Sequence, residues 1–432
     1  MSTGDLTAII GFVSLFLMIG LRVPIGIAMG LVGVFGFGVI RGFGPAFSLL
    51  ASSPIRVIAD FNLTLVPFFI LMGVFATNSG MSRELFRAGN AWMGHFRGGL
   101  ALSTIAACAG FAAICGSSVA TAATMTKIAL PEMRRFGYAE SAATGVIAAG
   151  GTLGILIPPS VVLVVYAYIT ETDVGQLFVA GIIPGLLAVV FYMATVLIAH
   201  RKNLPKSGKF SFREALSSLS GIWAVAILFI GVIFSMYFGI ATPTEAAGVG
   251  ALLTMVIGVV RGRLNTKLII ESLVEALRIS VTVYTVLIGA VLFGYFLAIT
   301  QSPQKITAFL VGLDLSAHGT LALILIFFVF MGCILDTMAM IILLVPIVFP
   351  VIVLLGFDPI WFGIIIVMTA ELGLITPPVG INVFVINSIA KDVKLTTIFK
   401  GVIPFIISDL FRMAVLVAFP MIVLWLPMTM RS

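Results

Sequence analysis

The stretch Gly151-Thr152-Leu153-Gly154-Ile155-Leu156-Ile157-Pro158-Pro159-Ser160 lies inside a long apolar segment, and Gly373-Leu374-Ile375-Thr376-Pro377-Pro378 repeats its pattern in the second half of the chain. A proline inside a helix lacks the N–H donor of its turn and clashes with the preceding turn. The neighbouring glycines relax the limits on backbone conformation. Each stretch is therefore predicted to unwind about one helical turn and to free carbonyl groups in the middle of a span.

Composition identifies the solvent around most of this chain as lipid. Of its 432 residues, 61% are hydrophobic and 9% are charged, whereas a soluble domain carries roughly 25% charged residues. Too few charges remain to cover a water-facing surface of this size. Apolar runs close to the length of a membrane span are predicted at 5–20, 24–40, 60–77, 139–170, 177–200, 219–239, 246–260, 276–300, 360–390 and 401–427.

Two further apolar stretches, 101–130 and 317–350, are interrupted by small or polar residues and fit poorly as single spans. If each enters and leaves the membrane on one side, nineteen of the chain's 24 Lys and Arg fall on the same side, which is then the cytoplasmic side. We therefore expect a re-entrant hairpin from each side and both termini in the periplasm. This bias also explains the net charge of +7, so no nucleic-acid partner is expected.

The two halves of the chain carry the same landmarks in the same order. The first half has Gly116, Pro131, Gly137, a proline pair, Asp173 and Pro184, and the second has Gly332, Pro350, Gly356, a proline pair, Asp392 and Pro404. The predicted topology inverts one copy relative to the other. Inverted repeats with broken helices are typical of secondary transporters, which bind substrate near the midplane between the repeats.

Hydroxyl and carboxylate side chains gather at the two predicted hairpin tips: Ser117, Ser118, Thr121, Asp336 and Thr337. Such oxygens suit a sodium ion or a substrate carboxylate, although small hydroxyl residues also let membrane helices pack closely. A carboxylate such as Asp336 costs about 2.5 kcal/mol or more near the bilayer centre. It therefore needs a cation, a proton or a partner, and we expect it to couple an ion or to hold the hairpin.

Other charged residues within spans have simpler roles. Asp409 and Arg412 stand three apart on one helix face and are predicted to form a structural ion pair. Glu371, just before Gly373, is a second acid in a span, for which a role in ion coupling and a structural role both stay open. Glu245 follows Thr242 at the start of a span, where helix capping accounts for it.

Two amphipathic stretches, 81–97 and 262–278, are predicted to be interfacial arm helices. They are either braces for a moving domain or passive juxtamembrane helices. No Walker A loop, nucleophile elbow or HExxH motif occurs, so we expect neither an ATP-driven motor nor an enzyme.

Several of these segments resemble the large membrane subunit, DctM type, of the tripartite ATP-independent periplasmic (TRAP) transporters. The resemblance covers nearly the whole chain. It is carried by Gly116-Ser117-Ser118-x-Ala120-Thr121, Leu130-Pro131-Glu132-Met133, the stretch 151–160, Thr242-Pro243-Thr244-Glu245-Ala246 and Thr376-Pro377-Pro378-Val379-Gly380.

The resemblance implies an all-α, inverted-repeat elevator, in which a transport domain of hairpins and broken helices moves across a scaffold. It also implies three kinds of partner: a small four-helix membrane subunit, a periplasmic substrate-binding protein and an organic-acid substrate. Sodium is the implied coupling ion, and no other cofactor is expected. The substrate is expected to be a C4-dicarboxylate, a 2-oxo acid or sialic acid, taken up across the bacterial inner membrane.

Site residues follow from the resemblance by position. One sodium site is expected to be bordered by Ser117, Ser118, Gly150, Gly154 and Pro158, and the other by Gly332, Asp336, Thr337, Gly373, Thr376 and Pro377. The substrate is expected to meet Ser117, Thr121, Ser160 and Thr376, and Glu245 is assigned to the scaffold.

The domain plan assigns 1–100 and 201–300 to the scaffold, each with one arm helix. It assigns 101–200 and 301–432 to the two transport-domain repeats. An alternative is a standalone anion transporter, coupled to sodium or protons, that needs no binding protein. A membrane-embedded enzyme or a purely structural partner is less favoured, because Asp336 and Glu371 lack a nucleophile or metal ligands beside them and a structural partner has no need of two broken spans.

Overall fold

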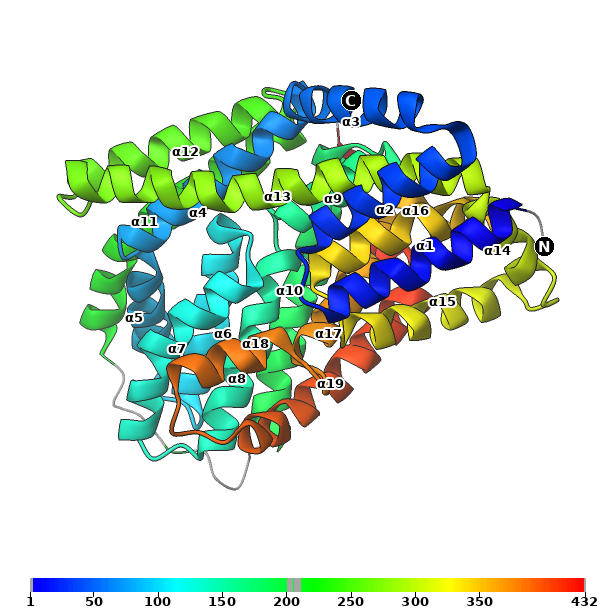
Figure 1. Ribbon diagram of the computed structural model, residues 1–432. Coiled ribbons are helices and arrows are strands. Elements are labelled where there is room, and N and C mark those ends of the chain that lie inside the picture. The colour runs from blue at the N-terminus through cyan, green and yellow to red at the C-terminus, as the bar shows by residue number, and fades with distance from the viewer. Residues whose placement is uncertain (1–2, 200–204, 206–210, 431–432) are drawn as a thin grey trace.

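The computed structural model describes residues 3–199, 205 and 211–430, and these residues form helices without any β-strand (Figure 1). Seven of the described helices are long and apolar enough to cross a membrane, or eight if one bent pair counts as a single span. The predicted all-α, multi-pass membrane architecture is therefore confirmed. Hydrophobic side chains also cover much of the outer surface, as a lipid-facing protein requires.

The internal repeat is a feature of the structure as well as of the sequence. The helix α8 (Glu140–Leu156) corresponds to α17 (Pro359–Ile375), because the two have the same length and both of their ends are displaced equally along the chain. The helices that follow also correspond, as do the proline pairs, which are cis in both copies. These following helices are α9 (Val161–Thr170) and α10 (Val174–Ala199) in the first repeat, and α18 (Ile381–Ile389) and α19 (Leu395–Ala418) in the second.

Both predicted helix breaks are present. The helices α8 and α9 are separated by Ile157–Ser160 and their axes are bent by 41°. The helices α17 and α18 are separated by 376–380. Proline and glycine interrupt the hydrogen-bond ladder at the same place in both copies, which is the physical cause expected from the sequence.

Each repeat begins with a pair of helices that pack against each other. In the first repeat these are α6 (Gly99–Cys115) and α7 (Ser118–Arg135), and in the second they are α15 (Ala317–Gly332) and α16 (Thr337–Leu354). The tips between them fall at 116–117 and 333–336, where the sequence predicts the two hairpin tips.

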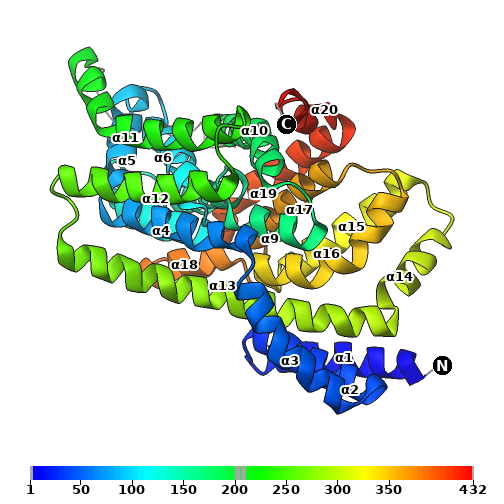
Figure 2. The same cartoon turned by 90° about the horizontal axis from the view of Figure 1, so that it is seen from above.

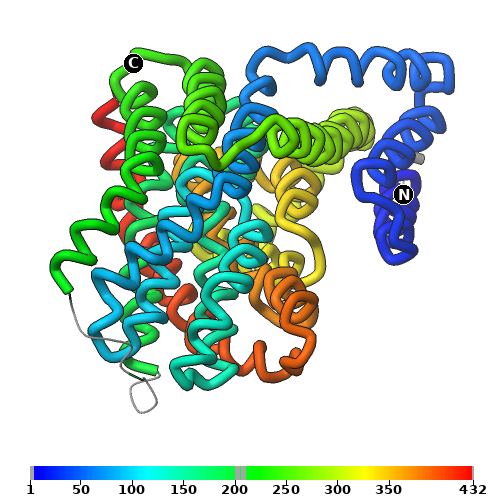
Figure 3. The backbone as a smooth tube through the Cα atoms, turned by 90° about the vertical axis from the view of Figure 1, so that its left-hand side faces the viewer, coloured from blue at the N-terminus to red at the C-terminus, as the bar shows by residue number. Residues whose placement is uncertain are grey.

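The N-terminal helices form a separate group beside the body of the molecule (Figure 3). These are α1 (Thr3–Gly20), α2 (Ile25–Arg41) and α3 (Phe43–Ile58). The helix α13 (Thr266–Thr300) runs between this group and the body (Figure 2), because α2 packs on one side of it and α4 (Leu65–Asn78) on the other. Gly26 of α2 and Gly289 of α13 meet backbone to backbone, so a Cβ on Gly289 would clash.

Three elements differ from the sequence prediction. The arm expected at 262–278 and the span expected at 276–300 form the single continuous helix α13, because nothing between them breaks a helix. The helices α3 and α14 (Ser302–Val311) were not expected. Both are shorter than a span, and hydropathy over a span-length window does not detect them. The remaining helices are η1 (Phe61–Thr64), α11 (Phe212–Tyr237), α12 (Pro243–Val260), α20 (Met421–Leu424) and η2 (Pro427–Thr429).

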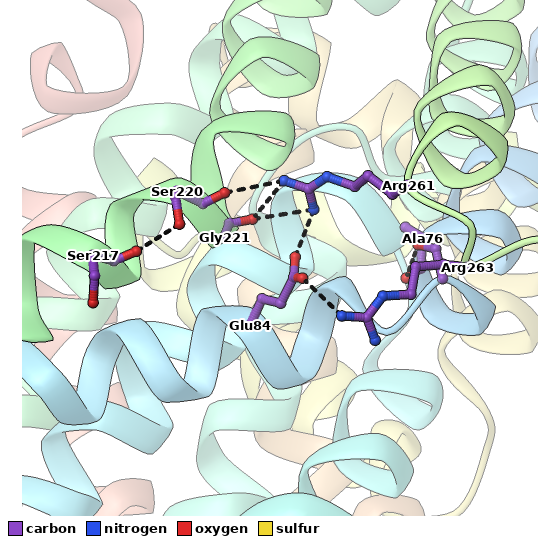
Figure 4. A network of polar contacts seen from close by, with 8 residues as sticks. Ala76, Glu84, Ser217, Ser220, Gly221, Arg261 and Arg263 are labelled. Atoms are coloured by element: carbon purple, nitrogen blue, oxygen red, sulfur yellow. Dashed lines mark hydrogen bonds and ion pairs between the residues drawn. The ribbon is translucent and has the colours of Figure 1, made fainter.

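The helix predicted as the first arm, α5 (Met81–Met93), is held to neighbouring helices by charged side chains (Figure 4). Glu84 of α5 accepts a hydrogen bond of 2.7 Å from Nη1 of Arg261, and Nη2 of Arg261 donates to the carbonyl oxygen of Ser220 on α11 at 3.2 Å. The guanidinium carbon of Arg261 lies 4.9 Å from the ring centre of Trp223. The arm is therefore tied to α11 and to the end of α12 rather than lying free on the surface.

Candidate substrate and ion site

The first break lies directly against the first hairpin tip. A Cβ on Gly154 would lie 2.5 Å from the carbonyl oxygen of Ser117, and a Cβ on Gly116 would lie 2.6 Å from the carbonyl oxygen of Pro159. Real Cβ contacts are essentially never so short, so glycine is required at both positions for the two backbones to meet. Ser117, Ser118 and Gly154 of the predicted first ion site are thus brought together, whereas Gly150 lies against Cys108.

The second repeat makes the corresponding contact. A Cβ on Gly373 would clash with the backbone of Gly332 at the second hairpin tip. Gly373 is the counterpart of Gly154 in the repeated motif, so the same close approach of break and tip occurs in both copies. The two halves of the predicted second ion site also meet.

Both hairpin tips line one cavity of about 490 Å³. The first tip contributes 115–120, the second contributes 336–338, and the helix ends that flank the first break contribute Ile155, Val161 and Val162. The cavity also touches the helices α4 and α13. Among its described lining residues, none comes from the second break, so Thr376 and Pro377 stand apart from this space.

Helix ends dominate the wall of this cavity. The first turns of α7, α9 and α16 face it, and so do the last residues of α6 and α8. A helix N-terminus presents free N–H groups and partial positive charge, whereas a C-terminus presents carbonyl oxygens and partial negative charge. The cavity therefore offers donors for an anion beside oxygens for a cation.

The hydroxyl groups predicted to bind ligands mostly hold the backbone of the break and the tip. Ser117 Oγ accepts a 3.3 Å hydrogen bond from the Ala120 N–H, and the Thr121 hydroxyl donates to the Ser117 carbonyl oxygen at 2.7 Å. Ser160 is buried, and its hydroxyl donates to the Ile155 carbonyl oxygen at 2.6 Å, across the first break. Ser117 and Ser160 are the N-caps of α7 and α9, and the three hydroxyls bond to the backbone around the site.

Asp336 and Thr337 differ in this respect. Asp336 caps α16 by accepting a 3.2 Å hydrogen bond from the Met338 N–H, and its carboxylate borders the cavity. Thr337 lines the same cavity, and its hydroxyl oxygen is buried without a hydrogen-bond partner. A buried hydroxyl without a partner is costly, so a ligand oxygen acceptor or a cation is the natural partner for this atom.

Asn382 was not among the residues predicted from the sequence. It is fully buried on α18, and its amide nitrogen donates to the Ala148 carbonyl oxygen of α8 at 3.3 Å. Its amide oxygen has no hydrogen-bond partner, and a Cβ on Gly151 would lie 3.1 Å from its nitrogen. The sequence signal was an amide in an apolar run just after the second break, and only the folded chain brings this amide beside Gly151.

The buried charged residues Glu371, Asp409 and Arg412 form ion pairs with one another. The predicted pair is present, with Nη2 of Arg412 2.9 Å from Asp409 Oδ1. The same Nη2 atom lies 2.6 Å from Oε2 of Glu371, a contact the sequence did not indicate. All three side chains are buried. The signal was present nonetheless, because two acids and one base in apolar spans are expected to neutralise one another.

Glu245 belongs to a capping box at the start of α12. Thr242 Oγ1 accepts a 3.3 Å hydrogen bond from the Glu245 N–H, and the Thr242 N–H donates to Glu245 Oε2 at 2.8 Å. The capping interpretation therefore accounts for this residue.

A larger cavity of about 890 Å³ lies elsewhere in the molecule, lined by residues of η1, α9, α13 and α16. Asp60, Glu171 and Asp173 give its wall an acidic character. Its apolar lining includes Leu65, Val164, Leu287 and Ile342. None of the predicted site residues lines it.

Residues 12–422 match the family model described as "Tripartite ATP-independent periplasmic transporter, DctM component". The chain belongs to this family. The DctM-family permease is thus a member of the family that its motifs resemble, and the description of that family names a component of three-part transporters.

Curated relatives of the chain are also TRAP transporter permeases. The permease is 37% identical to the C4-dicarboxylate TRAP transporter large permease protein DctM of Pseudomonas aeruginosa, over 89% of this chain and 93% of the relative. It is 34% identical to the isethionate TRAP transporter permease protein DctMQ of Oleidesulfovibrio alaskensis, over 93% of this chain and 63% of the relative. It is 32% identical to the sialic acid TRAP transporter large permease protein SiaM of Vibrio cholerae, over 86% of this chain and 87% of the relative.

The permease also shares its fold with a crystal structure of the YdaH transporter of Alcanivorax borkumensis. The TM-score is 0.60 at 15% sequence identity, and the match covers 89% of each chain. At this identity the likeness concerns the fold alone.

Proposed function

We propose that the permease takes up a small organic acid together with sodium, by moving hairpins and broken helices as one body across a scaffold. The observation that carries this proposal is the cavity of about 490 Å³, where three helix N-termini and two helix C-termini meet at both hairpin tips. Such a wall suits an anion and a cation at once. A transporter that couples the two needs this combination.

The anionic substrate is supported by the N–H donors of the cavity. Its charged described lining residues are Lys127, Glu275 and Asp336, so a bound cation would have to offset the two acids. The first turns of α7, α9 and α16 supply N–H groups, and Lys127 is the cation among the described residues of its wall. A carboxylate is the group that such donors bind best. The names of the relatives include C4-dicarboxylate, isethionate and sialic acid, which are all organic acids.

Sodium is supported by the oxygen chemistry of the second tip. Asp336 and Thr337 offer a carboxylate and a buried hydroxyl without a partner, beside the freed backbone where Gly332 meets Gly373. A cation bound there would offset the cost of the carboxylate in an apolar setting. Sodium would bind first, close the tips and complete the site for the anion.

The conformation described by the structure is inward-facing in this proposal. Asn78, Lys127 and Glu275 line the cavity with the tips, and the Lys and Arg bias places these residues near the cytoplasm. The acidic cavity near Asp60 would then open to the periplasm. The membrane is the bacterial inner membrane, and both termini lie on its periplasmic side.

The proposed partners are a small membrane subunit and a periplasmic binding protein. The isethionate relative, whose name joins DctM and DctQ, is longer than this chain, which covers 63% of it. We propose that a small membrane subunit of this kind joins the permease. The separate N-terminal helices and α13, which expose many large apolar side chains, provide a surface for that subunit within the membrane.

The test is uptake into vesicles. The permease, its small subunit and a binding protein encoded beside it are reconstituted and supplied with labelled succinate, pyruvate or sialic acid. We expect uptake that needs an inward sodium gradient and the binding protein. Full uptake on a proton gradient alone would reject sodium coupling, and full uptake without the binding protein would favour a standalone transporter.

A further inference from the structure

The buried charges form one network with two hydroxyl groups. Among the residues that the structure describes, the buried charged side chains are Glu371, Asp409 and Arg412. The Tyr192 hydroxyl donates to Asp409 Oδ2 at 2.7 Å. The Thr152 hydroxyl lies 3.0 Å from the Tyr192 oxygen and 2.7 Å from the Ala149 carbonyl oxygen, so it shares its one proton between these two acceptors. The network thus runs from α8 through α10 and α19 to α17.

The internal repeat relates the two ends of this network. Thr152 and Glu371 occupy equivalent positions on α8 and α17, because each precedes the glycine of its break by the same interval. Tyr192 and Arg412 are likewise equivalent, because each follows the proline of its long helix, Pro184 or Pro404, by the same interval. In each repeat, the broken helix therefore contacts the following long helix through an equivalent pair, which is a hydrogen bond in the first and an ion pair in the second.

Each pair lies close to its break. Thr152 and Glu371 stand less than one helical turn before Gly154 and Gly373 respectively. Those are the glycines that meet the hairpin tips. A displacement of the first break must therefore move Thr152, and a displacement of the second break must move Glu371.

The two pairs are joined across the repeats by Asp409 and by ring contact. Asp409 is bound by both Tyr192 and Arg412, and the Arg412 guanidinium carbon lies 5.7 Å from the ring centre of Tyr192. Because these groups are shielded from water, pulling the charged members apart leaves a charge buried without a partner, which is strongly unfavourable. The members therefore move together or not at all.

We propose that Thr152, Tyr192, Asp409, Arg412 and Glu371 form a positioning network that couples the two helix breaks, so that ordering one break orders the other. Coupling between sites is reciprocal, because it is a single free energy shared by both. The part of this inference that concerns sodium rests on the proposed function: a cation bound at one break raises the affinity of the other. The coupling of the breaks themselves does not depend on the nature of the ligand.

Hydrogen exchange on the full-length chain in lipid nanodiscs tests the coupling without any ligand. Glu371→Gln keeps the size of the side chain but removes its charge. We expect exchange to rise at least about fivefold, the lower end of typical coupling, at residues 150–160, in the opposite repeat. Tyr192→Phe should give the reciprocal result at residues 371–380. Unchanged exchange at the opposite break in both variants would overturn the proposal.

Thr369→Val is the matched control for Glu371→Gln. Thr369 is buried on the same helix, and its hydroxyl contacts the Ile365 carbonyl oxygen at 2.8 Å and the Met413 sulfur at 3.6 Å, outside the network. This variant should leave exchange at 150–160 unchanged. An equal rise in the control would show general loosening of α17 and would also overturn the proposal.

A sodium titration separates this inference from the proposed function. Thermal stability is followed as sodium chloride replaces choline chloride. We expect a Hill coefficient above one for the unmodified chain and close to one for Tyr192→Phe. A chain that does not respond to sodium would reject the proposed coupling ion, and the exchange experiment would still decide the network. An unchanged Hill coefficient in Tyr192→Phe would count against the network itself.

Discussion

Gly154 in the first broken helix approaches Ser117 at the first hairpin tip so closely that a Cβ would lie 2.5 Å from the Ser117 carbonyl oxygen. Gly373 and Gly332 make the equivalent approach in the second repeat. In each repeat, the glycine-proline motif that stands out in the sequence thus packs directly against a hairpin tip. Transport should depend on this close backbone contact.

Replacing Gly154 with alanine should abolish most uptake, because the added methyl group must push the tip away from the break. We expect at least about a tenfold loss of uptake and a loss of about 1–3 kcal/mol in stability from overpacking. Gly294→Ala is the control, since no atom lies within 4 Å of a Cβ on this helical glycine. Uptake by Gly154→Ala at the level of Gly294→Ala would contradict the importance of this contact.

Replacing Asp336 with asparagine separates its two roles. Asparagine caps helices as well as aspartate, so the bond from the Met338 N–H and the thermal stability should be kept. The negative charge is lost, and we expect the sodium concentration for half-maximal uptake to rise at least about tenfold, which corresponds to about 1.4 kcal/mol. Asp358→Asn, which caps α17 in the same way, is the control. A normal sodium dependence in Asp336→Asn would assign this residue to capping alone.

Replacing Thr337 with valine has effects of opposite sign on stability and on ligand binding. The hydroxyl is buried without a partner, so its removal should leave stability in sodium-free buffer unchanged or raised by up to about 1 kcal/mol. Stabilisation by sodium should become weaker. Thr126→Val, whose hydroxyl serves its own helix, should leave the sodium response intact. Lower stability with an intact sodium response in Thr337→Val would exclude the hydroxyl as a ligand.

Replacing Arg412 with alanine should be severely destabilising, because two carboxylates are left buried without their cation. We expect a loss of about 3–5 kcal/mol, seen as a lower melting temperature in detergent and poor yield. Arg135→Ala removes an exposed ion pair with Glu132 and should cost less than about 1 kcal/mol. Similar melting temperatures for both variants would contradict the assignment of a buried network.

Replacing Arg261 with lysine should loosen the first arm. Lysine cannot span Glu84 and the Ser220 carbonyl oxygen with one planar group, as arginine does here (Figure 4). We expect faster hydrogen exchange at residues 81–93 and slower uptake. Arg22→Lys is a control at an exposed position away from the arm. Unchanged exchange in the arm would mean that Arg261 does not hold it.

Much of the architecture follows from local sequence. Composition identifies lipid as the solvent. Proline and glycine determine the two hairpin tips, the two helix breaks and the equivalence of the halves, because they act on the local backbone whatever the tertiary contacts are. The capping role of Glu245 and the pair of Asp409 with Arg412 are also local, since both involve residues three apart on one helix. The domain boundaries and the ligand-binding roles of the site residues stay predictions.

Other features depend on which helices meet. The pairing of Glu371 with Arg412 and the approach of Asn382 to α8 involve packing that no local pattern specifies. The hydroxyls of Ser117 and Ser160 suggested ligands, and only the folded chain shows that they bond to the backbone around the break and the tip.

Sequence alone thus determined where the backbone breaks, because proline and glycine disrupt a helix through their own covalent structure. Tertiary structure alone decided what lies beside each break. A hairpin tip lies on one side, and the buried network of Thr152, Tyr192, Asp409, Arg412 and Glu371 lies on the other. Those contacts join residues from opposite halves of the chain, such as Thr152 and Arg412 through Tyr192. Their partners are selected by the packing of helices in an environment without water, where every polar group must find another.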